Sequence, residues 1–173
     1  MFTDACPVRS VRLILHVQSD GNFKILVVDD SDDDLFFIRK ALDRVGIGKT
    51  VNSVHDGQEA IDYLCGHGEF SNRQKFPFPT IILSDLKMPR MSGFELLRWV
   101  REHPDCGVIP TILFTSSAIE DDVREAYRLG ANAYMVKPSK PEELDELLRT
   151  VCEFWSRCER PVHLENCTRP PAT

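Results

Sequence analysis

The sequence has no extended run of lysines and arginines, and acidic residues outnumber basic ones. It contains 27 Asp and Glu against 21 Lys and Arg, which gives a formal net charge of −6. Proteins that bind the nucleic-acid backbone usually carry a basic face, so we expect no direct nucleic-acid partner. No apolar stretch approaches the roughly 20 residues that a membrane-spanning helix needs, so we expect no membrane partner.

Close cysteine pairs and a secretory leader are also missing. None of the six cysteines has C-x-x-C spacing, which argues against a structural zinc site. Near the start of the chain, Arg9 and Arg12 precede a short apolar run over residues 13–17. That run is too short for a signal peptide, and no small-residue cleavage site follows it. We therefore expect a cytoplasmic protein, with residues 1–22 as an N-terminal extension outside the core.

What the sequence does contain is a regular alternation of strand-like and helix-like segments. The five expected strands cover residues 24–28, 50–54, 80–84, 110–114 and 133–136. Each is followed by apolar residues that recur with helical spacing. Apolar strands separated by helices indicate a parallel sheet with helices on both faces. The sequence thus predicts an α/β fold, a doubly wound (βα)5 unit with a five-stranded parallel sheet over residues 23–156, and a flexible C-terminal tail over 157–173.

Several helix starts carry a residue that can cap the helix. We assign caps to Ser31, Ser92, Ser117 and Ser139, each followed three residues later by an acidic residue. The carboxylates of residues 32–34 are interpreted as first-turn charges favoured by the helix dipole.

The connection over residues 66–79 is long and rich in Phe and Pro. Its aromatic residues Phe70, Phe76 and Phe78 have two interpretations. They anchor the loop to the core, or they form a surface for a partner.

Polar side chains stand where the expected strands end. Asp29 and Asp30 follow the first strand, and Asp85 follows the third. Thr115 follows the fourth strand, and Lys137 follows the fifth. Because ligands of open parallel sheets bind beyond the carboxyl ends of the strands, we expect these residues to form one site.

The chemistry of these groups suits phosphoryl transfer. Clustered carboxylates repel one another and call for a cation, and oxygen ligands with retained water suit Mg²⁺. Asp85 beside the metal can act as a nucleophile and form an acyl phosphate. Lys137 supplies a mobile positive charge for one phosphoryl oxygen, and the hydroxyl of Thr115 can hydrogen-bond another.

Four ordered motifs resemble the receiver domains of two-component response regulators. They are residues 25–31 (ILVVDDS), 84–89 (SDLKMP), 114–116 (FTS) and 134–138 (YMVKP). The resemblance runs through nearly the whole of residues 24–156 and implies the flavodoxin-like receiver fold. The long connection before the third strand resembles that of single-domain regulators that partner phytochrome-type histidine kinases.

The resemblance implies a role for each site residue. Asp85 matches the phosphoacceptor of the family. Asp30 and Asp85 are then expected to bind Mg²⁺ directly, together with the backbone carbonyl of Lys87. Asp29 is expected to act through a coordinated water.

The function implied by the resemblance is that of a stand-alone response regulator in a phosphorelay. A histidine kinase is the expected partner, and the protein is a phosphoacceptor switch that assists its own phosphorylation and dephosphorylation rather than an enzyme. Thr115 and Tyr134 match the family's switch pair, in which the hydroxyl moves to the phosphoryl group and the ring turns inward. The signal is expected to leave through the fourth helix, fifth strand and fifth helix, around residues 120–155, by changed protein contacts that include homodimer formation.

Two other functions stay open. One is an aspartyl phosphatase of the haloacid-dehalogenase type, because Asp30 and Asp32 match its D-x-D element. That family places its nucleophile after the first strand, whereas Asp85 follows the third. The other is a degenerate receiver that acts only as a binding scaffold, and the intact acidic residues, Thr115 and Lys137 argue against it.

Overall fold

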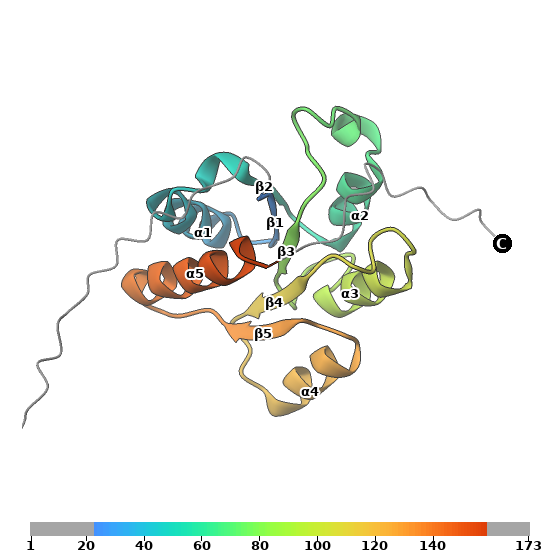
Figure 1. The fold of residues 1–173 in the computed structure, drawn as a ribbon. Coiled ribbons are helices and arrows are strands. Elements are labelled where there is room, and N and C mark those ends of the chain that lie inside the picture. Colours follow the sequence, from blue (N-terminus) through green and yellow to red (C-terminus); the bar gives the residue numbers. More distant parts are fainter. Residues whose placement is uncertain (1–22, 159–173) are drawn as a thin grey trace, which may run out of the picture.

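The computed structural model of the protein describes residues 23–158 (Figure 1). The expectations for residues 1–22 and 159–173 lie outside the described residues. The described chain forms one five-stranded parallel sheet in the order β2-β1-β3-β4-β5. The strands are β1 (Ile25–Val28), β2 (Val51–Val54), β3 (Ile81–Ser84), β4 (Thr111–Thr115) and β5 (Ala133–Val136). The predicted α/β fold with five parallel strands is confirmed.

Helices connect the strands and cover both faces of the sheet. They are α1 (Asp32–Val45), α2 (Gly57–Cys65), α3 (Gly93–Glu102), α4 (Glu120–Arg128) and α5 (Pro141–Ser156), with short 3-10 helices η1 (Gly48–Thr50) and η2 (Gly68–Ser71). In Figure 1, α1 and α5 lie together on one face, α2 and α3 on the other, and α4 lies beside β5. Within the described part of the chain, no helix is both long enough and apolar enough to cross a membrane.

Strand β1 shows why its sequence is a continuous apolar run. Ile25 and Val27 belong to the core cluster beneath α1 and α5, whereas Leu26 and Val28 belong to the cluster beneath α2 and α3. All four side chains are at most 2% exposed. Successive side chains of a strand point to opposite faces, so a strand covered on both faces must be apolar at every position.

The strand order places the site. After β1 the chain crosses to β2 on one side of it, and β3 then pairs with β1 on the other side. Loops that leave neighbouring strands in opposite directions open a crevice at the carboxyl edge of the sheet. The residues that follow β1 and β3 therefore stand at this crevice.

Two of the four predicted helix caps are confirmed, and two are wrong. Ser31 accepts a hydrogen bond from the third residue of α1, and Ser92 forms a complete capping box on α3. Ser117 does not cap α4, because that helix begins later and the Ser117 hydroxyl donates to Asp122 at 2.6 Å. Ser139 does not cap α5, which begins without a side-chain cap.

The long connection between α2 and β3 is anchored by its aromatic residues. The ring of Tyr63, which is buried, lies 5.3 Å from that of Phe70 and 6.0 Å from that of Phe76, centroid to centroid. Arg73 donates a 2.7 Å hydrogen bond to the carbonyl of Tyr63 and lies 5.8 Å from the ring of Phe78. The loop-anchoring interpretation of these phenylalanines is confirmed.

Candidate functional site

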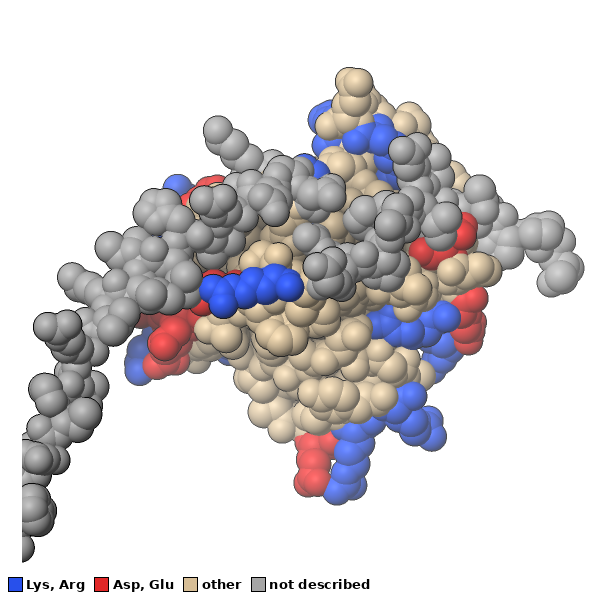
Figure 2. Space-filling model, in the orientation of Figure 1, with Lys and Arg blue, Asp and Glu red and all other residues tan. Residues whose placement is uncertain are grey.

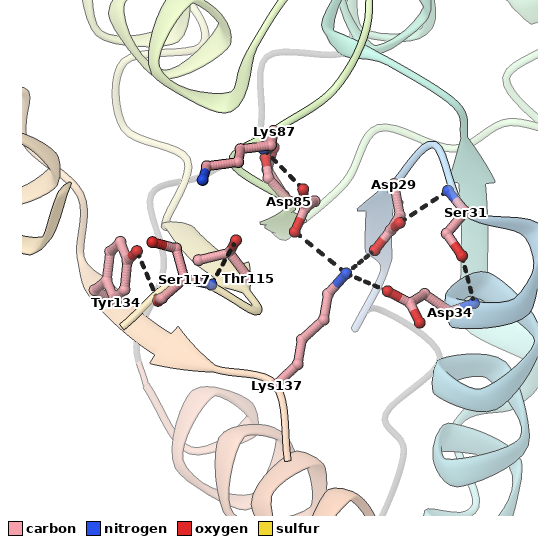
Figure 3. Close-up of polar contacts among 10 residues, drawn as sticks. Asp29, Ser31, Asp34, Asp85, Lys87, Thr115, Ser117, Tyr134 and Lys137 are labelled. Atoms are coloured by element: carbon pink, nitrogen blue, oxygen red, sulfur yellow. Dashed lines mark hydrogen bonds and ion pairs between the residues drawn. The ribbon is translucent and has the colours of Figure 1, made fainter. Parts of the chain in front are cut away.

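The predicted site residues meet at the carboxyl edge of the sheet. One open pocket of about 490 Å³ is lined by residues from four strand ends, among them Asp29, Asp30, Asp85, Lys87, Thr115 and Lys137. Figure 3 shows Asp29, Asp85 and Lys137 pointing toward one another across this edge. The structure thus brings the predicted groups together, while the role of each remains a prediction.

Lys137 is the centre of the polar contacts. Its Nζ lies 2.6 Å from Oδ2 of Asp29, 2.6 Å from Oδ2 of Asp34 and 3.2 Å from Oδ1 of Asp85. Only 12% of the Lys137 side chain is exposed. A lysine that reaches inward from the end of β5 therefore bridges carboxylates carried by β1, α1 and β3.

The electrostatics of this contact follow from burial and pairing. Burial lowers the pKa of the Lys137 amine, but its hydrogen bonds to Asp29 and Asp34 and the nearby carboxylate charges outweigh this and leave the pKa raised. Burial raises the pKa of the Asp29 carboxyl, while the hydrogen bond and charge of Lys137 oppose that shift. Lys137 is therefore charged at neutral pH, and removing it would leave buried carboxylates unpaired.

Asp85 is held from two sides. Its Oδ2 accepts a 2.8 Å hydrogen bond from the backbone N–H of Lys87, and its Oδ1 faces Lys137. Its own backbone N–H donates to the carbonyl of Val28 at 2.7 Å, which fixes it beside β1. Asp85 is buried, with 8% of the whole residue exposed, but it lines the open pocket. A group that approaches through the pocket can reach it.

Thr115 and Tyr134 both contact the backbone of Ser117 (Figure 3). The Thr115 hydroxyl lies 3.4 Å from the N–H of Ser117, from which it accepts, and the Tyr134 hydroxyl donates to the carbonyl of Ser117 at 3.0 Å. Thr115 is 2% exposed, and Tyr134 is half-buried against the cluster beneath α4. The predicted switch pair is thus joined through one residue of the β4–α4 connection.

The predicted metal ligands match Mg²⁺ in chemistry. Asp29, Asp30 and Asp85 and the carbonyl of Lys87 offer only oxygen atoms, which hard cations prefer, and Asp30 is exposed at the pocket. In residues 23–158, however, no three His, Cys, Asp or Glu side chains are gathered as a group that could hold a metal ion. The ammonium of Lys137 lies against two of the carboxylates instead, so joint binding of a cation requires these side chains to turn.

One glycine, Gly93, and one arginine, Arg90, shape the loop after β3. A Cβ on Gly93 would lie 2.2 Å from the carbonyl oxygen of Asp85, so only glycine permits the start of α3 to pack this closely. Arg90 adopts a φ of 62°, and its guanidinium pairs with Asp56 and, at 3.1 Å, with Glu59. These contacts tie the loop that carries Lys87 to the start of α2.

Two residues at the site were not predicted to act there. Asp34 was interpreted as a helix-dipole charge, yet it is a direct partner of Lys137. Ser117 was interpreted as a cap, yet its backbone links Thr115 and Tyr134. The only signal for Asp34 was its place in the first turn of α1, directly after the strand end that carries Asp29 and Asp30. No sequence signal pointed to a backbone contact at Ser117.

The comparisons with known proteins agree with this geometry. The family profile described as "Response regulator receiver domain" matches residues 25–149. The response regulator Rcp1 of Synechocystis is 32% identical over 148 residues, which cover 86% of this chain and 93% of that protein. The predicted resemblance to receiver domains is confirmed.

Solved structures give the same result. The phosphorylated cyanobacterial phytochrome response regulator RcpA matches with a TM-score of 0.74 at 32% identity, over 81% of this chain and 99% of that one. The response regulator RPA3017 in red light signaling of R. palustris matches with a TM-score of 0.75 at 31% identity, over the same shares of the two chains. The Mn²⁺-bound form of Rcp1 matches with a TM-score of 0.69 at 31% identity, again over 81% and 99%.

Proposed function

The chain belongs to the family of response regulator receiver domains, and from this premise we propose that it acts as a stand-alone response regulator in a two-component phosphorelay. It accepts a phosphoryl group from a histidine kinase on Asp85, with Mg²⁺ as the cofactor. It assists its own phosphorylation and dephosphorylation but does not turn over an external substrate. It works in the cytoplasm, without direct contact to nucleic acid or membrane, and signals through phosphorylation-dependent contacts with other proteins.

The observation that carries the proposal is the placement of Asp85 between two donors in an open pocket. Its two carboxylate oxygens face the N–H of Lys87 and the ammonium of Lys137. In the transfer, one carboxylate oxygen of Asp85 forms a bond to phosphorus. The bond from phosphorus to the imidazole nitrogen of the kinase breaks, and that nitrogen leaves with the electron pair. Positioning and charge neutralisation supply most of the catalysis in such transfers.

The other residues act on the charge that arrives. Lys137 donates a hydrogen bond to a phosphoryl oxygen, because its ammonium already lies 3.2 Å from Asp85. Thr115 donates its hydroxyl to another phosphoryl oxygen after turning from the N–H of Ser117. Charge neutralisation at the phosphoryl oxygens is the chemistry that bound Mg²⁺ would supply. Asp30, Asp85 and the Lys87 carbonyl would be its direct ligands, and Asp29 would act through a coordinated water.

A labelling experiment tests the proposal. The protein is incubated with Mg²⁺ and acetyl phosphate, and intact-mass and peptide measurements locate the label. We expect one phosphoryl group on Asp85, which is lost in mild alkali and absent from Asp85→Asn. Asp33→Asn, an exposed change of the same charge on α1, should label like the wild type. Undiminished labelling of Asp85→Asn would contradict the assignment.

The same preparation separates the rival functions. Steady release of phosphate from a phosphate ester would favour the haloacid-dehalogenase-type phosphatase. A folded protein that is labelled neither by acetyl phosphate nor by any kinase would favour a degenerate receiver used as a scaffold. Removal of Mg²⁺ with excess chelator should stop labelling, and labelling at the full rate would exclude the metal role.

The names of the relatives support a phytochrome-type kinase as the partner. RcpA is named a phytochrome response regulator, and RPA3017 belongs to red light signaling. We therefore expect phosphotransfer from a phytochrome-type histidine kinase to be faster than transfer from other kinases of the source organism. Profiling each purified kinase with this protein measures the preference, and equal transfer from all of them would contradict it.

The output surface is formed by α4, β5 and α5. Large apolar side chains are exposed on these elements, among them Tyr127 at 54%, Val136 at 44% and Phe154 at 60%. On the face in Figure 2, basic and acidic side chains are interspersed with uncharged surface. Such a surface suits protein contact, including contact with a second copy of this chain.

Sedimentation with and without beryllofluoride, a mimic of the phosphoryl group, tests this output. We expect the mimic to increase self-association and Tyr127→Lys to abolish the increase. Phe36→Lys places the same charge at a position that is equally exposed, at 56%, but lies on α1, and it should leave the increase intact. An increase that survives Tyr127→Lys would place the interface elsewhere.

A further inference from the structure

The carboxylate contacts of Lys137 restrict the position of its ammonium group. A lysine ammonium has three N–H donors, and Lys137 has three carboxylate partners within 3.2 Å, namely Asp29, Asp34 and Asp85. Two of these donors make hydrogen bonds, to Asp29 and Asp34, whereas the contact with Asp85 is an ion pair. The two hydrogen bonds hold the ammonium toward β1 and α1, so a move toward a phosphoryl oxygen on Asp85 lengthens at least one of them.

The three partners differ in how well water can replace the ammonium. The side chains of Asp29 and Asp85 are 3% and 9% exposed, whereas that of Asp34 is 39% exposed. A carboxylate that loses its partner in a buried place keeps most of its desolvation penalty. An exposed carboxylate is rehydrated instead, and exposed ion pairs contribute little. The contact with Asp34 is therefore the one that is given up most easily.

The backbone at Asp34 does not depend on this contact. Its N–H donates to the hydroxyl of Ser31 at 3.2 Å, which closes the first turn of α1. The Asp34 side chain can therefore leave Lys137 without loosening the helix start. In Figure 3 the Asp34 carboxylate reaches Lys137 from the helix, opposite Asp85.

We propose that Asp34 is a positioning residue that restrains Lys137 in the unphosphorylated protein and is released when a phosphoryl oxygen takes its place on the ammonium. The inference rests on the proposed function, because it concerns phosphorylation of Asp85. It adds a step to the switch: Lys137 exchanges an anion on α1 for the anion on Asp85. Asp34 thereby opposes the phosphorylated form.

Binding of beryllofluoride in the presence of Mg²⁺ measures this opposition. Asp34→Asn removes the negative charge that holds the Lys137 ammonium at α1, so we expect the mimic to bind about threefold to fivefold more tightly than to the wild type, the range of a partly exposed ion pair. Asp33→Asn is the matched control, since Asp33 is exposed on the same helical turn and carries the same charge. It should bind the mimic with wild-type affinity. Asp34→Glu, which keeps the carboxylate, should bind like the wild type.

A second readout follows the lysine itself. The ¹⁵Nζ resonance of the Lys137 ammonium should shift in Asp34→Asn and not in Asp33→Asn. Adding the mimic to the wild type should move it further than adding the mimic to Asp34→Asn, because the wild type also loses the Asp34 contact. Weaker or unchanged binding by Asp34→Asn, or equal shifts in both proteins, would overturn the proposal. Failure of the proposed function is distinct, because the wild type would then bind no mimic and take no label at Asp85.

Discussion

Tyr134 donates a hydrogen bond from its hydroxyl to the carbonyl oxygen of Ser117, at 3.0 Å. The N–H of the same residue faces the hydroxyl of Thr115 at 3.4 Å, a long contact that is readily exchanged. A move of Thr115 toward a phosphoryl group removes an acceptor from Ser117, and Tyr134 is bound to the other side of that residue. The backbone of Ser117 therefore provides a physical route from the pocket to the surface of β5.

Substitution of Thr115 should separate phosphorylation from its response. Thr115→Ala should still be labelled at Asp85, because it leaves Asp85 and Lys137 in place, but Tyr134 should no longer respond. Fluorine NMR of a fluorotyrosine at position 134, with and without beryllofluoride, measures the response. Thr115→Ser keeps the hydroxyl and should respond like the wild type. A full Tyr134 response in Thr115→Ala would rule out this route.

Gly93 should be required for the position of Asp85. In Gly93→Ala the new Cβ meets the Asp85 carbonyl oxygen at 2.2 Å and the Leu86 Cα at 3.0 Å, both of which are backbone atoms. We expect the free energy of unfolding to fall by about 1–3 kcal/mol, as for overpacking in a core, and labelling of Asp85 to slow. Gly107→Ala is a milder control, since its nearest contact is 3.3 Å. Urea denaturation and labelling rates of both variants give the comparison, and equal losses would show that the contact at Asp85 is unimportant.

The fold could be predicted from the sequence because each element carries its own periodic signal. β1 is apolar at every position because both of its faces are covered. The strands and helices alternate along the chain, so the end of each strand can be located in the sequence. The meeting of Asp29, Asp85 and Lys137 at one edge required only the rule that parallel strands end together.

What could not be predicted was the choice among competing partners. Asp34 follows Ser31 by three residues and could have completed a local capping box, but its carboxylate binds Lys137, which is 103 positions away. The hydroxyl of Ser117 likewise binds Asp122 rather than capping the helix. Such choices depend on distances that only the folded chain sets.

Lys137 should stabilise the fold as well as the phosphoryl group. Lys137→Met leaves Asp29 and Asp85 buried without their cation, so we expect the free energy of unfolding at pH 7 to fall by about 3 kcal/mol. Lys140→Met removes an exposed ion pair with Glu143, so it should change the free energy of unfolding little. Denaturation of both variants in urea measures the difference, and a loss as small in Lys137→Met as in Lys140→Met would contradict the pairing.

The same contact predicts a pH dependence. The pKa of Lys137 is raised in the folded protein, so its stabilising contribution is complete below about pH 10.4, its unfolded value, and declines only as the pH rises above that. The wild type should therefore lose stability in alkali more steeply than Lys137→Met. Unfolding free energies measured between about pH 8 and pH 11 test this difference in slope. Parallel curves for the two proteins would contradict the stabilising role of the charged Lys137.

Arg90 combines an unusual backbone conformation with a pair to a buried carboxylate. Its φ of 62° lies in the region that favours glycine, and Asp56, with which it pairs, has a side chain that is only 1% exposed. Arg90→Ala and Arg90→Gly lose the same ion pair, but only glycine relaxes the backbone. Both variants should be less stable than the wild type. The free energy of unfolding of Arg90→Gly should exceed that of Arg90→Ala by about 1 kcal/mol.

Stability and labelling together test this view of the Arg90 loop. The loop also carries the N–H of Lys87 that binds Asp85, so both variants should label more slowly, because the loop is no longer tied to the start of α2. Urea denaturation measures the stability order, and acetyl phosphate labelling measures the rate. If Arg90→Ala is as stable as Arg90→Gly, the backbone is not strained at this position. If both label at the wild-type rate, the pair with Asp56 stabilises the fold without positioning Asp85.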